Sequence, residues 1–323
     1  MVRGGGRNRL SVAISIAFMG VAVATLYHLL HGIDGGKVIA AIKAQSGIRI
    51  LIAAALVAAG YSNLIFYDLF ALHTIGKRNM PFPVVAFASF TSYTIGHSLG
   101  AATLTCGLVR FRVYSFWGLT VVDIAKIAFM TGVTFWLGNI FVLGGAVAYA
   151  PDALTVFDQL PPALNRLLGL SGLFAVLCYL IWIAARPRIV GRANWQIELP
   201  NLRWTFLQIG IGTVDRGLAS LSLFILLPSE PAVGFVTVVV VFVLATLLGA
   251  MSHTPGSLGV VEAAILIGLP QYPREELLAI VLTFRVLDFF LPLFIATTMF
   301  GFRELRLIAR TRKVEPPPLP RTL

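Results

Sequence analysis

Five ionisable residues interrupt long apolar runs in the C-terminal half of the chain: Asp215, Arg216, Glu262, Arg285 and Asp288. A charge in the middle of a membrane helix costs about 3 kcal/mol on insertion scales, so it tends to face a partner or water. Arg285 and Asp288 are three residues apart and can pair on one helix face. The Arg285–Asp288 and Asp215–Arg216 pairs either hold helices together or line a substrate path. Three acids stand against two bases, and we expect Glu262 to be the acid left for a cationic substrate group or a proton.

A second group of candidates lies nearer the N-terminus: Asp68, His97, Arg110 and Arg112. On a helix Arg110 and Arg112 would diverge, whereas in an extended loop they would point the same way. They are either anchors on the cytoplasmic side, or one of them grips a lipid phosphate with both arms of its guanidinium. We expect Asp68 to meet a substrate ammonium. For His97 we favour a helix-capping or structural role over proton transfer.

Two glycine-containing segments predict breaks in apolar helices. The first is marked by Gly96, His97 and Gly100, and the second by Pro255, Gly256 and Gly259. Non-helical backbone at membrane depth is tolerated only where it is buried in protein or lines a wet cavity. Both breaks contain Ser-Leu-Gly, and paired breaks in the two halves of a chain are typical of transporters built from inverted repeats. The breaks therefore point to a cavity and to a possible internal inverted repeat.

The composition sets the class of protein. Of the 323 residues, 58% are apolar and only 12% are charged, too little polar surface to coat a soluble globule of this size. The apolar runs approach the ~20 residues of a spanning helix and lack the alternation of a membrane β-barrel. The fold class predicted is therefore an all-α, polytopic membrane protein. The net charge is +11, and the basic residues lie between the apolar runs and at both ends of the chain. This distribution favours anionic lipids over nucleic acid as partner.

The basic residues also predict topology. Clusters at the N-terminus, at Lys77-Arg78, between Arg186 and Arg192, and in the tail should be cytoplasmic. About eight spans follow, near residues 10–30, 48–73, 119–145, 167–185, 204–227, 232–251, 257–270 and 277–302, with both termini inside. Residues 84–105 lie between two basic clusters and should form a re-entrant hairpin. We expect a transmembrane domain over 1–302 and a basic, proline-rich cytoplasmic tail or linker over 303–323.

Several of these segments resemble one known family. The stretches 92–100 and 107–115, with Gly118-Leu119, resemble the first signature of the lysylphosphatidylglycerol synthase transmembrane family, the flippase module of the multiple peptide resistance factors. Later signatures follow in the same order: Asp215, Leu226-Leu227-Pro228, the stretch 255–262, Phe284-Arg285 and Pro292. Two positions depart from the pattern. Ser257 stands where the family usually has glycine, and Asp288 stands where a tyrosine is often found, so Asp288 is either a family site or a local feature.

The resemblance implies a protein of the bacterial inner membrane that moves aminoacylated phosphatidylglycerol, such as the lysyl ester, to the outer leaflet. That transfer would give resistance to cationic antimicrobial peptides. The family's aminoacyl-transferase domain has no counterpart in this sequence, so a transferase partner or a further domain is open, as is a homo-oligomer. No nucleotide, cofactor or metal motif is visible. A secondary transporter of a small solute, a structural subunit, and the membrane part of a lipid aminoacyl or glycosyl transferase are the alternatives.

Overall fold

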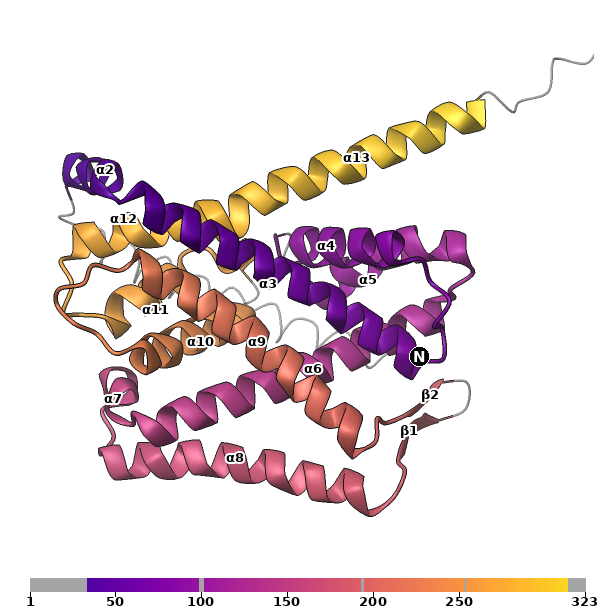
Figure 1. Cartoon of the computed structure of the whole chain (residues 1–323), viewed down its shortest axis with the longest axis horizontal. Coiled ribbons are helices and arrows are strands. Elements are labelled where there is room, and N and C mark those ends of the chain that lie inside the picture. The colour runs from indigo at the N-terminus through magenta and orange to yellow at the C-terminus, as the bar shows by residue number, and fades with distance from the viewer. Residues whose placement is uncertain (1–33, 99–101, 193–194, 253, 313–323) are drawn as a thin grey trace, which may run out of the picture.

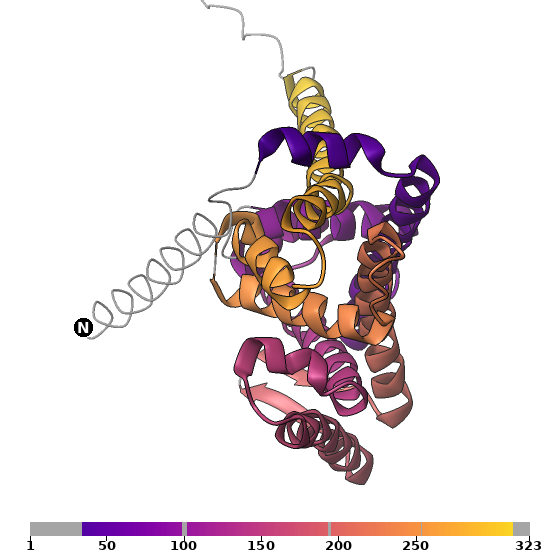
Figure 2. The same cartoon turned by 90° about the vertical axis from the view of Figure 1, so that its left-hand side faces the viewer.

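The computed structural model describes residues 34–98, 102–192, 195–252 and 254–312, which form a helical bundle with one small β-hairpin (Figures 1 and 2). Within these ranges six helical segments are long and apolar enough to cross a membrane: Gly47–Thr74, Val121–Tyr149, Pro162–Ala185, Leu202–Leu226, Phe235–Ser252 and Arg274–Ala309. The chain is a polytopic all-α membrane protein, as its composition predicts.

The elements follow in this order: α2 (Gly35–Ala44), α3 (Gly47–Thr74), α4 (Phe82–Ser98), α5 (Ala102–Tyr114), η1 (Ser115–Trp117), α6 (Val121–Tyr149), α7 (Asp152–Asp158), α8 (Pro162–Ala185), β1 (Ile189–Arg192), β2 (Trp195–Glu198), α9 (Leu202–Leu226), α10 (Phe235–Ser252), η2 (Pro255–Ser257), α11 (Val260–Gly268), α12 (Arg274–Arg285), the π-helical η3 (Val286–Phe290) and α13 (Leu291–Arg312). Five of the eight predicted spans match helices to within about five residues, and the span predicted at 277–302 lies inside the longer segment Arg274–Ala309. The span predicted at 10–30 lies outside the described residues. The span at 257–270 is mostly α11, whose 9 residues make a helix too short to cross the bilayer.

Local signals explain where several helices begin. Thr120 and Asp123 form a capping box at the start of α6, in which each side chain accepts from the other residue's backbone N–H. The side chain of Asn201 accepts from the backbone N–H of Trp204 and caps α9. A proline stands at the first position of α8, where a missing N–H costs nothing.

Helices α4 and α5 form the predicted hairpin. Lys77 precedes α4 and Asp123 follows α5, and their side chains lie 3.7 Å apart, so the chain enters and leaves at the same end of the bundle. The two helices approach so closely that a Cβ at Gly96 would collide with Cys106 Sγ. Gly100, predicted as part of the bend, lies outside the described residues.

The second break produces another hairpin, formed by α10 and α11. A Cβ at Gly249 would lie 2.6 Å from the Ser257 Cβ, and one at Gly268 would lie 2.6 Å from Val241, so α11 runs back along α10. The turn between them uses left-handed backbone at Gly256 (φ 62°) and Gly259 (φ 84°), which glycine adopts without a steric penalty. Pro255 opens this turn, so the break occurs where the sequence predicts it.

The two hairpins enter the bundle from opposite ends and meet in its middle, where α4 contacts η2 (Figure 1). Each follows a long helix, α3 or α9, and these two helices run antiparallel. The Asn63 side chain donates to the Ile211 carbonyl, while the His73 ring lies against Trp204 with the ring centroids 4.5 Å apart. This order of elements is the one that an inverted repeat requires.

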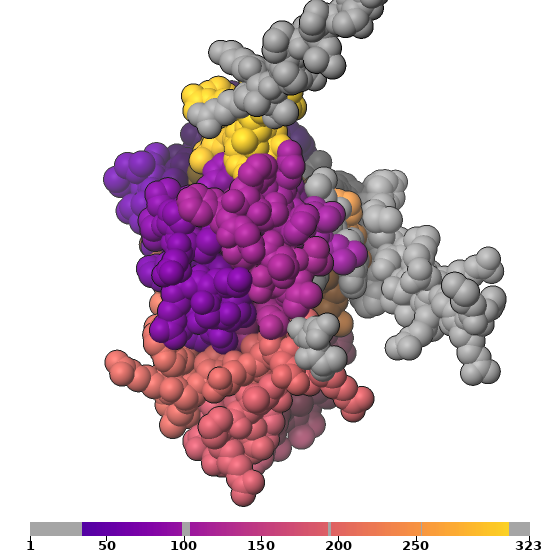
Figure 3. All heavy atoms as spheres, turned by 90° about the vertical axis from the view of Figure 1, so that its right-hand side faces the viewer, coloured from indigo at the N-terminus to yellow at the C-terminus, as the bar shows by residue number. Residues whose placement is uncertain are grey.

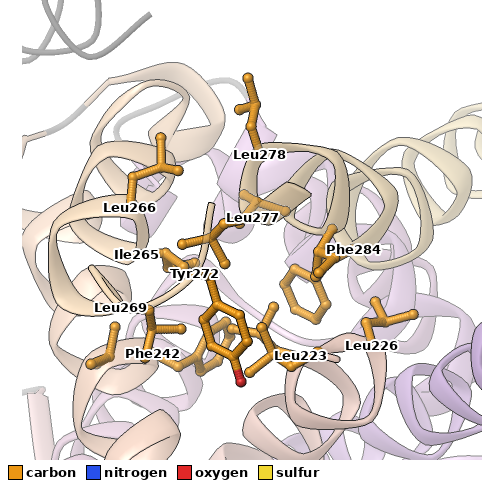
Figure 4. Close-up of a cluster of buried hydrophobic side chains, with 14 of the residues drawn as sticks. Leu223, Leu226, Phe242, Ile265, Leu266, Leu269, Tyr272, Leu277, Leu278 and Phe284 are labelled. Atoms are coloured by element: carbon orange, nitrogen blue, oxygen red, sulfur yellow. The ribbon is translucent and has the colours of Figure 1, made fainter. Parts of the chain in front are cut away.

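Small residues allow the central helices to cross closely. A Cβ at Gly138 of α6 would lie 2.5 Å from the Gly212 Cα of α9, so a side chain at this crossing would push the helices apart. A separate apolar core fixes the C-terminal hairpin, with Leu223, Phe242 and Ile265 among its members (Figure 4). These contacts place α9 to α12 as one unit.

The sequence did not predict two features. Residues 189–192 and 195–198 form two antiparallel strands, in which Val190 pairs with Ile197. Residues 303–312 of the predicted tail continue helix α13, which projects from the bundle (Figures 1 and 3). Residues 313–323 lie outside the described part, and the domain boundary at 302 stays a prediction.

The arrangement of the helix ends gives a testable topology. In a variant with Cys106 and Cys178 replaced, we expect single cysteines at Arg78, Trp117 and Glu304 to react only with reagents that reach the cytoplasm. A cysteine at Asp152, the first residue of α7, should react from outside, because α7 lies at the opposite end of the bundle (Figure 1). Accessibility labelling of intact and permeabilised cells measures this. If positions 78 and 304 were labelled from opposite sides, the orientation of the hairpin would be wrong.

Candidate functional site

A buried ion pair ties the N-terminal hairpin to α3. Arg110 donates through Nε and Nη2 to the two carboxylate oxygens of Asp68, at 3.1 and 2.7 Å, and both side chains are almost fully buried (2% and 0% exposed). The Tyr114 hydroxyl donates to Asp68 at 2.8 Å, and the Arg110 guanidinium lies 4.8 Å from the Tyr93 ring centroid. Asp68 and Arg110 therefore satisfy each other in this structure, where the sequence suggested that they meet a substrate.

Arg112 lies on the opposite face of α5. Its side chain is 52% exposed and donates through Nε and Nη2 to Glu304 of α13, at 3.1 and 2.6 Å. Arg303 binds the other oxygen of the same carboxylate at 2.7 Å. The two arginines diverge because this segment is a helix and not a loop, which settles the alternative that the sequence left open. Arg112 thus joins α5 to α13 at one end of the bundle, shown in Figure 3 with α5 in purple to magenta and α13 in yellow above it.

A second ion pair lies on α9. Arg216 donates to Asp215 Oδ2 through Nε and Nη2, at 3.0 and 2.6 Å, and the Tyr67 hydroxyl donates to the same oxygen at 3.3 Å. Both Asp215 and Arg216 have little exposed side chain, and Arg216 also lies 5.5 Å from the Phe135 ring centroid. The pair forms between neighbouring residues, as the sequence allowed.

The third pair joins the C-terminal hairpin to α12. Arg285 donates to Glu262 Oε1 at 2.5 Å and to the carbonyls of Gly256 and Ser257 at 3.2 Å each. The break at η2 leaves these carbonyls without helical N–H donors. A guanidinium has five N–H groups and can donate to them instead. The other oxygen of Glu262 accepts from the Gly259 backbone N–H at 2.7 Å.

This arrangement corrects two expectations. Arg285 pairs with Glu262 and not with Asp288, because the re-entrant α11 brings Glu262 alongside α12. Glu262 is consequently matched on both oxygens, so it is not the acid left over for a substrate.

The unmatched acid is Asp288. Within the part of the chain that the structure describes, its carboxylate has no hydrogen bond and no ion pair, while its backbone carbonyl accepts from the Tyr61 hydroxyl at 2.8 Å. Asp288 is partly buried in η3, the π-helical segment between α12 and α13, and it interacts electrostatically with Arg285, Arg216 and Asp215. π-Helical turns of this kind are frequent at functional sites. The expected excess of one acid is present, at a different residue.

Aromatic residues connect the charged groups. Tyr67 donates its hydroxyl to Asp215, and its ring centroid lies 5.9 Å from that of Tyr93. The Tyr93 ring in turn lies against Arg110. The Tyr61 hydroxyl donates to the backbone carbonyl of the unmatched Asp288. The sequence gave no sign of these roles because a neutral phenol does not stand out in an apolar helix. The available signal was proximity, since Tyr67 adjoins Asp68 and Tyr114 lies four residues after Arg110.

The remaining predicted residues have helical or turn roles. His97 Nδ1 donates to the Tyr93 carbonyl one turn earlier, at 2.8 Å. Among the residues that the structure describes, no group of three or more His, Cys, Asp or Glu side chains could hold a metal ion.

Fold and site together define a polytopic helical membrane protein with two opposed hairpins and charged residues in its interior. No family model matches the chain. It is similar to the uncharacterized protein slr0712 of Synechocystis sp., with 29% identity over 302 residues that cover 93% of this chain and 94% of that protein. It is also similar to the inner membrane protein YbhN of Escherichia coli, with 29% identity over 276 residues that cover 82% of this chain and 83% of YbhN.

Proposed function

We propose that this protein is a lipid flippase that moves aminoacylated phosphatidylglycerol, such as the lysyl ester, from the inner to the outer leaflet. The observation that carries the proposal is the unmatched Asp288 in the middle of the bundle, within electrostatic range of Arg216 and Arg285. The headgroup of lysylphosphatidylglycerol bears a phosphate and two ammonium groups. An acid with nearby guanidinium groups offers complementary charges to both kinds of group.

The roles in the proposed path follow from how each group is already bonded. Asp288 receives an ammonium, because its carboxylate is not committed elsewhere. Arg216 meets the phosphate by exchanging part of its bond to Asp215, which keeps the Tyr67 hydroxyl as donor. Arg285 and Glu262 hold the second break in shape, and Arg110 and Asp68 anchor the first hairpin to α3. The acyl chains stay in the lipid, so only the headgroup needs a polar path.

The proposed location is the bacterial inner membrane, with both termini in the cytoplasm. The similarity to an inner membrane protein of Escherichia coli supports the membrane assignment. The basic residues at the end that carries Lys77, Arg78 and Arg303 support the orientation, since basic residues flanking membrane spans favour the cytoplasmic side.

A secondary transporter of a small solute is the second candidate, and the opposed hairpins favour it. Many transporters place their binding site between inverted repeats with broken helices. The two functions differ in what must cross: a solute passes through a pathway sealed from lipid, whereas a lipid headgroup needs a path that opens sideways to the bilayer.

A leaflet assay with the purified full chain tests the proposal. Proteoliposomes would carry fluorescent lysylphosphatidylglycerol or phosphatidylglycerol, and a membrane-impermeant quencher would report the fraction in the outer leaflet. We expect transfer of the lysyl lipid to exceed that in protein-free liposomes by at least about tenfold, and to exceed transfer of phosphatidylglycerol, which lacks the ammonium groups. Equal rates with and without protein, for both lipids, would exclude the flippase.

A further inference from the structure

A groove lies outside the charged interior, between α3 and α9. It has a volume of about 510 Å³ and is lined by Asn63, Phe66 and His73 on one wall and by Trp204, Leu207 and Val214 on the other. Phe66, Leu207 and Val214 are largely exposed, so the groove opens sideways, away from the protein core. We call it the α3–α9 groove.

The groove is apolar along its length and basic at one end. Lys77 and Arg78 line it just beyond the C-terminus of α3, beside His73 and Trp204. Arg78 is exposed, and Lys77 is 42% exposed with Asp123 at 3.7 Å as its neighbouring acid. The two cations therefore outnumber the single acid at this mouth.

The dimensions match one leaflet of a bilayer. Asn63 and His73 are ten residues apart on α3, so at the rise of an α-helix the groove runs for about 15 Å. That is half of the ~30 Å hydrocarbon core. Tryptophan and basic side chains are enriched at the level of the headgroups, which is where Trp204, Lys77 and Arg78 would then lie.

We infer that the α3–α9 groove binds one phospholipid with an anionic headgroup, its phosphate at Lys77 and Arg78 and an acyl chain between Phe66 and Leu207. An apolar channel of one leaflet's depth, open to lipid and basic only at its interfacial end, suits this occupant. A peptide would instead need polar partners for its backbone along the groove, and the walls are nearly all apolar. The inference goes beyond the proposed function, because lysylphosphatidylglycerol, with one phosphate and two ammonium groups, has a net positive headgroup and is not the anionic lipid that the groove selects.

Binding can be measured without transport. The purified full chain in detergent is titrated with dioleoylphosphatidylglycerol or dioleoylphosphatidylcholine, and native mass spectrometry counts the bound lipids. We expect phosphatidylglycerol to bind more tightly than phosphatidylcholine. The double variant Lys77→Gln and Arg78→Gln should weaken phosphatidylglycerol binding about tenfold or more. Each Lys or Arg near the headgroups contributes about 1 kcal/mol of attraction to anionic lipid, and a tenfold change in affinity is about 1.4 kcal/mol. Its matched control, Arg186→Gln with Arg192→Gln, removes two exposed cations elsewhere.

A second change fills the groove. Gly210 lines it, and a Cβ there would meet no atom within 4 Å, so Gly210→Leu adds bulk from a position with free space. Gly210→Leu should weaken the binding of both lipids. Gly132→Leu on α6, where a Cβ also has open space, should weaken the binding of neither. If the Gly210→Leu protein has a lower melting temperature than the wild type, Val214→Trp is the alternative variant that fills the groove from the same helix.

The outcomes separate the two proposals. Unchanged binding in the Lys77/Arg78 variant, equal binding of the two lipids, or full binding in a stable groove-filled variant would each overturn the inference. Selective binding that these variants abolish, in a protein inactive in the leaflet assay, would keep the groove site and remove the flippase. Active transfer without selective binding would keep the flippase and remove the groove site.

Discussion

Arg110→Ala should destabilise the protein by about 3–5 kcal/mol, because it leaves the fully buried Asp68 carboxylate without its ion partner. The Tyr114 hydroxyl alone cannot replace two charged donors. We expect a large fall in melting temperature and in the yield of folded protein, measured by fluorescence-detected size exclusion after heating.

Two variants show whether the lost pair is the cause. Arg112→Ala is the matched control, since it removes the same side chain two residues later, on the exposed face of α5, and should have little effect on stability. Combining Asp68→Asn with Arg110→Met removes both charges and should recover much of the stability, because the carboxylate no longer needs a partner. Equal damage from Arg110→Ala and Arg112→Ala would show that burial of the pair is not what matters.

Asp288→Asn should reduce transfer of lysylphosphatidylglycerol by about 10- to 100-fold, the loss expected when one hydrogen bond to a charged group is removed. Stability should be unchanged or slightly higher, because the Asp288 carboxylate has no hydrogen bond or ion pair with the described residues and asparagine removes a partly buried charge. The leaflet assay measures the first effect and thermal unfolding the second. Phosphatidylglycerol, which has no ammonium group, should be affected less.

Asp152→Asn is the matched control for Asp288→Asn. It makes the same chemical change at an exposed residue at the start of α7, outside the buried ion pairs, and should leave transfer intact. A well-folded Asp288→Asn protein that transfers lysyl lipid at the normal rate would remove Asp288 from the path. The proposed charge recognition would then depend on Asp215 and Glu262, which are already paired with arginines.

The course of the chain was largely readable from sequence. Runs of apolar residues near bilayer length predicted most of the helices, because a segment in lipid must satisfy its backbone within itself. Glycine and proline predicted the break at residues 255–259, and the positions of basic residues predicted the α4–α5 hairpin. The strands at 189–192 and 195–198 were missed because each has only 4 residues, too few for an alternating pattern to stand out after a basic stretch that reads as a loop. The helical course of residues 303–312 was missed because the basic charge suggested a linker.

The candidate residues were found more reliably than their partners. Charges within apolar runs identified Asp215, Arg216, Glu262, Arg285 and Asp288, since a costly group in that setting must be compensated. Spacing along one helix suggested that Arg285 pairs with Asp288, and this was wrong. A partner 23 residues away, on a re-entrant helix, offers a better position than one at i+3.

The sequence by itself determined the class of protein, most of the long helices in the described part of the chain, and the excess of one buried acid. These properties depend on composition and local order, which a linear pattern contains. Only the tertiary structure decided which acid is unmatched, that Arg110 is buried while Arg112 faces outward, and that the groove between α3 and α9 exists. Each of these depends on which helices lie side by side, and that arrangement is set by close glycine contacts such as Gly138 with Gly212, and by ion pairs between segments far apart in the chain.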